Sequence, residues 1–363
     1  MNITAWSALS PFGHTSADFA AGVRDRRPTA APVLGEDGQQ GCLVPGFEPR
    51  TVLGKKGTRD MNRVTALAVT SVGAVLDGSA DGGAGGGSTD GWGTDDRGTD
   101  TGLDTALVLG TTTGSVQSMT DFTRSSLTGE RPYDVEPGVI PNSVMNCAAA
   151  QCAIRHRIQG PNTTLAGGRA AALLGLLYAR RLLRAHRART VLCGAAEEYS
   201  HARTWLEARS RGGSAPVLLG EGAAVLRLVP AELPTSTPSL ATVLAVHTRH
   251  APPGCDPTEA LHTTLIETLS RARVAAADVW SATSSGLEAT EDDALDALFP
   301  RQARDRLPAL GPLIGDTGAA ASALQIATVL AAAGQAPGGP AVITSVDGQG
   351  LVAAAVLRLG KAH

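Results

Sequence analysis

The chain has 363 residues, a formal net charge of −3 and 43% hydrophobic residues. This size suffices for one large core or two fused halves, and the near-neutral charge argues against a nucleic-acid-binding protein. Five scattered cysteines, an odd number without metal-ligand spacing, favour a reduced, cytoplasmic protein. The apolar runs are too short to cross a bilayer, so we expect no membrane association.

The first part of the chain alternates strand and helix patterns. Continuous apolar runs predict buried strands, and apolar residues at helical spacing predict helices. Residues 79–102 are rich in Gly, Asp, Ser and Thr and predict a disordered surface loop. The other expected elements are a strand at 2–9, a helix at 17–24 capped by Ser16, a helix at 59–76, a strand at 105–110, helices at 115–125 and 142–159, a strand at 163–165, a helix at 169–187, and strands at 190–194 and 223–229.

The pattern then restarts in a shorter form. The expected elements are a strand at 240–247, a helix at 257–273, a strand at 279–283, helices at 290–299 and 315–334, and strands at 341–346 and 352–359. Alternating strands and helices predict the α/β class. The repetition of this strand–helix pattern predicts two units, 1–232 and 239–363.

The stretch 160–172 has the layout of a nucleophile site. A Gly-Pro turn and a short β-prone run precede two glycines and a long apolar helix. A side chain at the first turn of such a helix faces unpaired N–H groups, which favours a thiolate. Arg169 occupies this position, and arginine is always cationic and cannot attack a carbonyl.

Across its whole length the chain resembles a β-ketoacyl synthase. Seven landmarks of that family occur in the family's order, at 8–13, 108–110, 160–161, 193–197, 220–223, 315–320 and 345–350. The resemblance implies a thiolase-like fold, five-layered α-β-α-β-α and built from two similar halves.

The residues that carry the family's chemistry are replaced. By this resemblance Arg169 stands at the family's cysteine, Asp316 and Ser285 stand at its two histidines, and Gly311 stands at its lysine. Condensation needs a thiolate to hold the acyl chain and histidines to support decarboxylation and the developing oxyanion. The resemblance therefore implies that the chain has no catalytic residues, no cofactor and no metal site.

A synthase framework without its chemistry resembles a chain-length factor, the ketosynthase beta subunit of a type II polyketide synthase. Such a subunit forms a heterodimer with an active ketosynthase and shapes the tunnel for the growing chain, so the complex carries out a decarboxylating Claisen condensation. An acyl carrier protein would dock mainly on the ketosynthase. Arginine where aromatic-type factors usually have glutamine favours a divergent polyene or reducing type. The alternatives are a stand-alone acyltransferase or decarboxylase with a non-standard residue set, and a decayed pseudoenzyme without a partner.

The resemblance also places residues at the tunnel and the dimer seam. These side chains are mostly small or flexible, and ordinary core packing is the alternative reading. They are Thr113, Ser115, Val116, Met119, Val139 and Met145.

Charge suggests two further hypotheses. The opposite charges of Arg169 and Asp316 predict a charge-assisted bridge across the vacated site, although independent drift is the alternative. An arginine cluster late in the helix at 169–187 complements the helix dipole or forms a patch for an acidic carrier protein. Its members are Arg180, Arg181, Arg184, Arg187 and Arg189.

Cysteine and histidine pairs offer weaker signals. Cys147 and Cys152 are within an expected helix rather than at its start, so small apolar packing is favoured over a relocated nucleophile. His247 and His250 fall on opposite faces of a strand, which disfavours a metal site.

Overall fold

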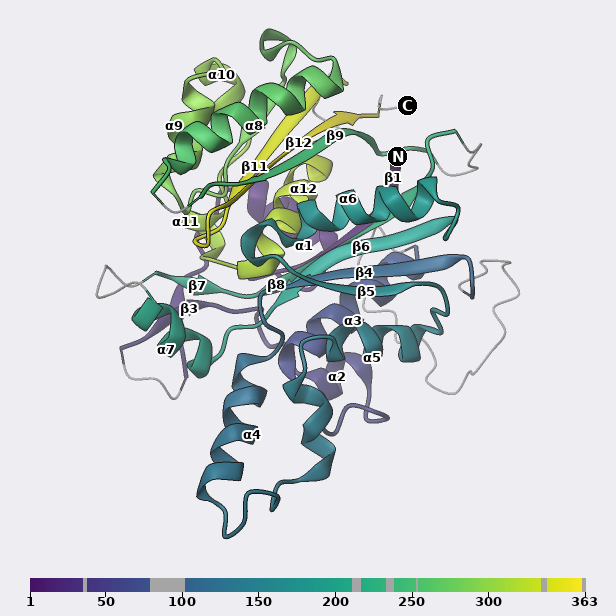
Figure 1. Ribbon diagram of the computed structural model, residues 1–363, viewed down its shortest axis with the longest axis vertical. Helices are drawn as coiled ribbons and strands as arrows, with labels where there is room; N and C mark the ends of the chain where they lie inside the picture. The colour runs from purple at the N-terminus through teal and green to yellow at the C-terminus, as the bar shows by residue number, and fades with distance from the viewer. Residues whose placement is uncertain are drawn as a thin grey trace.

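The computed structural model describes residues 1–34, 38–78, 102–210, 217–232, 238–252, 254–333 and 338–360 (Figure 1). The strands are β1 (Asn2–Leu9), β2 (Ala31–Pro32), β3 (Gln40–Cys42), β4 (Thr105–Thr111), β5 (Asn162–Ala166), β6 (Thr190–Glu197), β7 (Leu219–Gly220), β8 (Gly222–Val229), β9 (Ala241–His250), β10 (Ser281–Thr283), β11 (Pro340–Val346) and β12 (Leu351–Leu359). The α-helices are α1 (Ser16–Arg24), α2 (Pro49–Leu53), α3 (Arg63–Leu76), α4 (Val116–Thr128), α5 (Cys147–His156), α6 (Ala171–Arg184), α7 (His201–Ser210), α8 (Pro257–Ala272), α9 (Ala289–Asp296), α10 (Arg301–Arg304), α11 (Gly311–Ile314) and α12 (Ala321–Ala331). Short 3₁₀ helices are η1 (Pro137–Ser143), η2 (Gly168–Ala170), η3 (Ala276–Asp278) and η4 (Gly318–Ala320).

The described strands form one mixed nine-stranded sheet, in the order β10-β11-β12-β9-β1-β8-β6-β4-β5, and a small sheet of β2, β3 and β7. The nine-stranded sheet consists of two sets of strands, β10-β11-β12-β9 and β1-β8-β6-β4-β5. The two sets are joined where Asn2 pairs with Thr242 and Ile3 pairs with Ala241. The expected α/β class is confirmed.

Helices cover both faces of each set of strands. Helices α3 and α5 lie below the set that contains β4, β6 and β8, and α8 lies on the outer face of β9 and β12 (Figure 1). Between the two sets, α6 packs on β4 and β6 and also contacts β9, while α12 contacts β8 and β11. The α6–α12 layer is therefore buried from both sides.

Small residues let α6 lie close to the strands beneath it. A Cβ on Gly110 would stand 2.7 Å from the Cβ of Ala171, and one on Gly175 would stand 2.9 Å from the Sγ of Cys193. The same helix buries Leu173, Leu176 and several other apolar side chains in the core between the two sets of strands. This close packing fixes the turn that precedes α6 against the end of β4.

Several element ends differ from the sequence prediction. Helix α1 is capped by Thr15, whose side chain and that of Asp18 form a capping box, rather than by Ser16. The helix expected at 142–159 begins only at Cys147, because the Pro-containing segment before it forms η1. The helix expected at 315–334 begins at Ala321, after η4. The loop expected at 79–102 lies, except for Gly102, outside the described residues.

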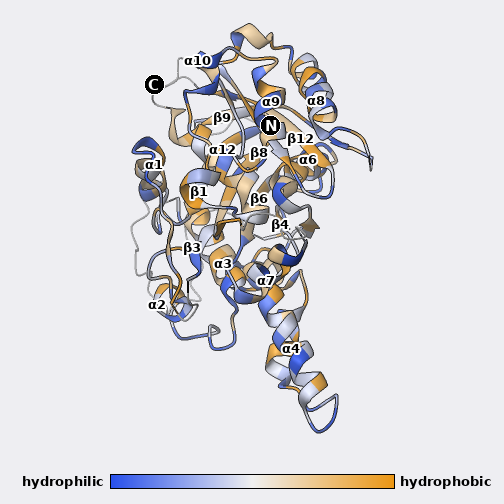
Figure 2. Cartoon of the chain, turned by 90° about the vertical axis from the view of Figure 1, so that its left-hand side faces the viewer, coloured by the Kyte–Doolittle hydropathy of each residue, from blue (hydrophilic) through white to orange (hydrophobic). Residues whose placement is uncertain are grey.

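Residues 116–144, named the α4 arm here, extend away from the body of the molecule (Figure 1 and Figure 2). Large apolar side chains are exposed on the α4 arm and just beyond it. They are Met119, Leu127, Tyr133, Ile140, Val144 and Met145. Within the described residues, no helix has both the length and the apolarity that crossing a membrane requires.

Candidate functional site

The turn between β5 and α6 requires glycine. Gly168 has φ +48°, and a Cβ there would stand 1.9 Å from Oδ2 of Asp347. That same carboxylate oxygen accepts a hydrogen bond from the backbone N–H of Arg169 at 3.2 Å. The loop between β11 and β12 therefore closes over the turn, and the Asp347 carboxylate accepts a hydrogen bond from one of the turn's N–H groups.

The side chain of Arg169 is buried against two carboxylates. Its Nε and Nη2 donate to Oδ2 of Asp316 at 3.1 and 2.7 Å, and its Nη1 donates to Oε1 of Glu288 at 2.6 Å. The side chains of Arg169 and Asp316 are only 7% and 4% exposed. The predicted contact between these two residues is therefore present, although both donors converge on one oxygen rather than forming a two-oxygen fork.

A second arginine holds Asp316 from the other side. Arg203 in α7 donates from Nη2 to the backbone carbonyl of Asp316 at 2.8 Å, and the same nitrogen lies 3.9 Å from Oδ1. The N–H of Gly318 donates to Oδ1 at 2.9 Å. We call Arg169, Asp316, Glu288 and Arg203 the ion-pair cluster.

Arg169 and Asp316 stabilise each other in their charged forms. Burial alone would raise the pKa of Asp316, but the charges of Arg169 and Arg203 outweigh it and lower that pKa below its usual value. Burial would likewise lower the pKa of Arg169, but Asp316 and Glu288 outweigh it and raise that pKa. Groups held in this way neither take up nor release a proton near neutral pH, so this pair is unsuited to general acid–base catalysis.

Two buried glutamates at the end of β6 lie beside the cluster. Glu197 accepts hydrogen bonds from the hydroxyl and the N–H of Thr112 and from the N–H of Ala319, and burial raises its pKa. Glu198 accepts from the Ser115 hydroxyl at 2.7 Å and from the Val64 N–H at 3.0 Å. Burial raises the pKa of Glu198 to about 7. Glu198 thus ties the start of the α4 arm to the start of α3.

Ser285 belongs to a different hydrogen-bond network. Its hydroxyl and its N–H donate to the two carboxylate oxygens of Glu291 at 2.7 and 2.8 Å. In the described part of the chain, no hydrogen bond of Ser285 reaches Arg169 or Asp316. Glu288 is the member of this loop that contacts Arg169.

Gly311 leaves no room for a side chain. A Cβ there would stand 2.7 Å from Cδ2 of Leu287 and 2.9 Å from the carbonyl oxygen of Gly286. A lysine at this position would displace the loop that carries Glu288.

The buried thiols are poorly suited to nucleophilic attack. Cys147 is the first residue of α5, which corrects the expectation that it lies within the helix, but burial raises its pKa. Burial also raises the pKa of Cys152, and it raises that of Cys193 to about 12. A thiol with a raised pKa stays protonated at neutral pH.

The candidate tunnel residues gather around the start of the α4 arm. Ser115 caps α4 by accepting from the Ser118 N–H at 3.1 Å, and its hydroxyl donates to Glu198, so its side chain is already engaged. Val116 is buried, whereas Met119 and Met145 are 43% and 37% exposed. Thr113 is also exposed, and Val139 is half-buried in η1.

Sequence reasoning missed three partners of Arg169 and Asp316: Glu288, Arg203 and Asp347. One signal was available for a further acid, because a guanidinium has five N–H donors and one carboxylate does not satisfy them all. Nothing in the local sequence pointed to Arg203, which lies 113 residues from Asp316 along the chain.

Comparison with known proteins places the chain in a family. Residues 89–227 match the profile of the β-ketoacyl synthase N-terminal domain. A search of curated protein sequences found no significant match. The solved structure of the ishigamide ketosynthase/chain length factor is 42% identical, covers 99% of both chains and superposes with a TM-score of 0.90.

More distant structures share the fold. A β-ketoacyl synthase from Burkholderia phymatum STM815 is 16% identical over 99% of both chains, with a TM-score of 0.80. A type II polyketide synthase ketosynthase, solved in complex with its acyl-carrier protein, is 16% identical over 99% of both chains, with a TM-score of 0.78. Together, the shared fold and the 42% identity over nearly the full length show that this chain belongs to the β-ketoacyl synthase family, as a relative of the ketosynthase/chain length factor proteins.

Proposed function

We propose that the chain is the non-catalytic chain-length factor of a type II polyketide synthase. It forms a cytoplasmic heterodimer with an active ketosynthase and shapes the tunnel for a chain carried on an acyl carrier protein. The observation that carries this proposal is the ion-pair cluster, in which Arg169 occupies the nucleophile turn and is held by Asp316 and Glu288. The relationship to a ketosynthase/chain length factor supports it.

The assignment of replaced positions belongs to this proposal. Arg169 stands at the family's cysteine, Asp316 and Ser285 at its histidines, and Gly311 at its lysine. In the described residues, none of the side chains that form a hydrogen bond or an ion pair with Arg169 or Asp316 is a cysteine or a histidine. A site with this composition has neither a thiolate to hold an acyl chain nor a neutral base.

Two surfaces suit a ketosynthase partner. Strand β5 is the last strand of the nine-stranded sheet, so one of its edges has backbone groups that another strand could pair with. Helix α5 contacts β5, and its Ile154 is 71% exposed. The adjoining α4 arm has further exposed apolar side chains. Exposed apolar surface of this kind is typical of a protein–protein interface.

The finer architecture is also part of the proposal. We interpret the layers of helices and strands as the five-layered α-β-α-β-α arrangement of thiolase-like proteins, with halves at 1–232 and 239–363. The carrier protein would dock mainly on the ketosynthase subunit, and the arginine at position 169 favours a polyene or reducing type of synthase.

Interface mutagenesis tests the heterodimer. Ile154→Glu places a charge beside β5, and Ile266→Glu makes the same change on α8, where Ile266 is 48% exposed. If the ketosynthase covers β5 and α5, Ile154→Glu reduces co-purification of the two subunits by roughly ten-fold or more, since a buried unpaired charge costs several kcal/mol. Ile266→Glu leaves co-purification unchanged. Equal recovery of both variants would contradict the proposed interface.

A further inference from the structure

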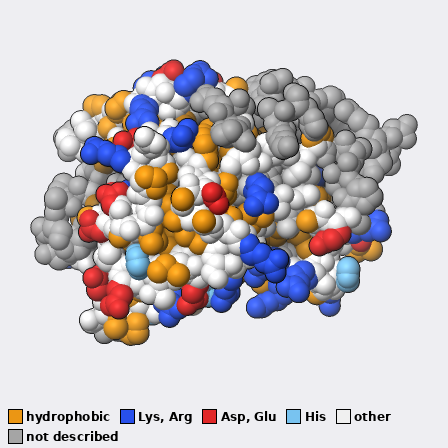
Figure 3. All heavy atoms as spheres, turned by 90° about the horizontal axis from the view of Figure 1, so that it is seen from above, with side chains coloured by type: hydrophobic (Ala, Val, Ile, Leu, Met, Phe, Trp, Pro, Cys, Tyr) orange, Lys and Arg blue, Asp and Glu red, His pale blue; other side chains and the backbone are white. Residues whose placement is uncertain are grey.

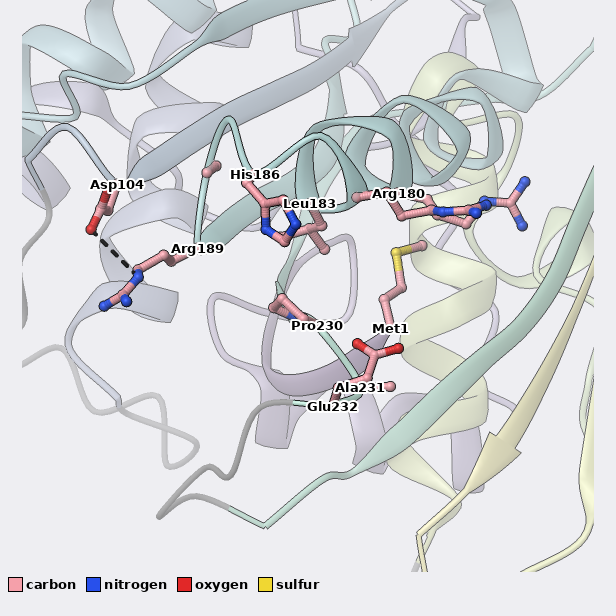
Figure 4. Close-up of a pocket in the computed structure, with 11 residues that line it drawn as sticks. Met1, Asp104, Arg180, Leu183, His186, Arg189, Pro230, Ala231 and Glu232 are labelled. Carbon is pink, nitrogen blue, oxygen red and sulfur yellow. Dashed lines mark ion pairs between the residues drawn. The ribbon is translucent and has the colours of Figure 1, made fainter.

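A hollow of about 780 Å³ lies at the far end of α6 from Arg169 (Figure 4). Helix α6 has 14 residues, so at 1.5 Å per residue the hollow is roughly 20 Å from the ion-pair cluster. Its volume is in the range of small-molecule sites. The hollow is therefore separate from the site already described.

Apolar and charged groups divide the lining of this hollow. Leu183, Ala188 and Pro230 contribute apolar surface, together with Met1 and Ala231. In Figure 4, Arg189 and Arg180 mark its two ends, with His186 and Leu183 between them above Pro230. The charged lining residues are Asp104, Arg180, Arg184, Arg189 and Glu232.

The positive charges in the lining exceed the negative ones. Asp104 lies 3.8 Å from Arg189, and Glu232, the other acid of the lining, acts on the amino group of Met1. Neither Arg180 nor Arg184 forms an ion pair within the described residues. In the view of Figure 3, Lys and Arg side chains gather near the lower edge, with acidic side chains on either side of them.

The helix dipole explains only part of this arrangement. Arg181 and Arg184 both lie in the last turn of α6, where cations are favourable. The dipole accounts for both equally, yet only Arg184 lines the hollow. Arg180 and Arg189 lie at opposite ends of the hollow, and Arg184 also lines it, so the lining carries more positive charge than its two acids balance.

The geometry points to a binding site for a small organic phosphate, with the phosphate held by Arg180 and Arg184 and the organic part on the apolar floor. Guanidinium groups match the geometry of phosphate oxygens, and two of them balance a doubly charged anion. Such a ligand contacts the arginine side chains rather than the helix carbonyls, whose partial charge would repel it. This site is independent of the proposed chain-length function.

Calorimetric titration of the full chain, in the form in which it purifies, tests the site with hexyl phosphate as the probe. We expect one site, with hexyl phosphate at least roughly ten-fold tighter than inorganic phosphate because the tail buries apolar surface. Arg184→Glu should weaken binding by roughly ten-fold or more, since a charge-assisted contact becomes a repulsion. The matched control Arg181→Glu should weaken binding by less than about three-fold. The charge at position 181 reaches the ligand only through solvent, where dissolved salt screens it.

A filling variant tests the hollow without changing charge. Ala231→Trp occupies the floor at an exposed position and should abolish hexyl phosphate binding while the fold is retained. Equal losses in Arg184→Glu and Arg181→Glu would show diffuse charge attraction and overturn the proposal. Unchanged binding by Ala231→Trp, or no detectable binding of hexyl phosphate to the unmodified chain, would overturn it as well.

Discussion

Nε and Nη2 of Arg169 both donate to a single oxygen, Oδ2 of Asp316, at 3.1 and 2.7 Å. This leaves Oδ1 of Asp316 for the Gly318 N–H and leaves Nη1 of Arg169 for Glu288. The two residues therefore form the centre of a network in which each charge has more than one partner. Removing Arg169 leaves the buried Asp316 with Arg203 as its remaining charged neighbour, whereas removing the charge of Asp316 leaves Arg169 paired with Glu288.

A double-mutant cycle measures this coupling. Arg169→Met leaves two carboxylates without their main partner, whereas Asp316→Asn leaves Arg169 paired with Glu288. We expect Arg169→Met to lower the free energy of unfolding by about 3–5 kcal/mol, because Asp316 stays buried without its main partner, and Asp316→Asn to lower it by less, because Arg169 keeps Glu288. The double variant should lose less than the sum. Denaturant unfolding of the purified protein measures all three.

A surface ion pair is the control for this cycle. Arg301 and Asp305 are paired at 3.4 Å with side chains 92% and 69% exposed. Arg301→Met should change the free energy of unfolding by no more than about 0.5 kcal/mol. Strict additivity of the Arg169 and Asp316 changes would contradict the coupled network.

Restoring a thiol should not restore chemistry. In Arg169→Cys the new side chain faces Asp316 and Glu288, whose negative charges raise a thiol pKa, and no histidine is among their contacts. We expect no acyl adduct when this variant is incubated with an acyl thioester and its intact mass is measured. A covalent adduct on the introduced thiol would show that the site still supports nucleophilic catalysis.

The glycine turn before α6 should tolerate no side chain. Gly168→Ala combines a positive φ with a Cβ that would stand 1.9 Å from the Asp347 carboxylate, so we expect a loss of at least about 1 kcal/mol in the free energy of unfolding. Gly348→Ala is the matched control in the neighbouring loop, where a Cβ would meet nothing within 4 Å. Thermal unfolding compares them, and equal midpoints would contradict the described closure of the loop over the turn.

Glu198 should make stability depend on pH. Its pKa in the folded protein is raised to about 7 by burial, so folding favours the protonated form. The stability that this group contributes is fully present below its unfolded pKa and is lost as pH rises through about 7. The neutral variant Glu198→Gln should therefore gain stability relative to the unmodified chain between pH 5 and pH 8. A difference that does not change with pH would contradict the raised pKa.

The α4 arm should influence product length. Met119 is 43% exposed on α4, so Met119→Trp adds bulk at a candidate tunnel position without overfilling the core of this chain. We expect the intact heterodimer to release shorter products, and mass spectrometry of the products measures this. Ile266→Trp, on α8 and away from the proposed interface, is the control and should leave product length unchanged. Unchanged products from Met119→Trp would count against a tunnel position there.

Much of the fold was readable because buried strands have continuous apolar runs. The strand expected at 105–110 is β4, all of whose residues are buried, and the final hairpin is present as β11 and β12. Helix starts were less predictable. Periodicity does not distinguish the 3₁₀ turns η1 and η4 from the first turn of the helix that follows, so α5 and α12 begin later than expected.

The candidate site was predictable only in part. Two substitutions to opposite charge were enough to suggest the contact between Arg169 and Asp316. Glu288 was missed, although Asp316 lies even farther from Arg169 along the chain, because only the folded chain shows which side chain of the 285–288 loop reaches Nη1 of Arg169. The role of Gly168 was equally hidden, since its constraint comes from Asp347 on a distant loop.

Native mass spectrometry of the chain co-expressed with an active ketosynthase, after incubation with an acyl-loaded carrier protein, tests the central claim most directly. The account predicts a 1:1 heterodimer with one acyl group, which remains on the ketosynthase when the subunits are separated. A stable homodimer of this chain that carries an acyl group of its own would contradict it, and the nucleophile would then have to be sought outside the ion-pair cluster.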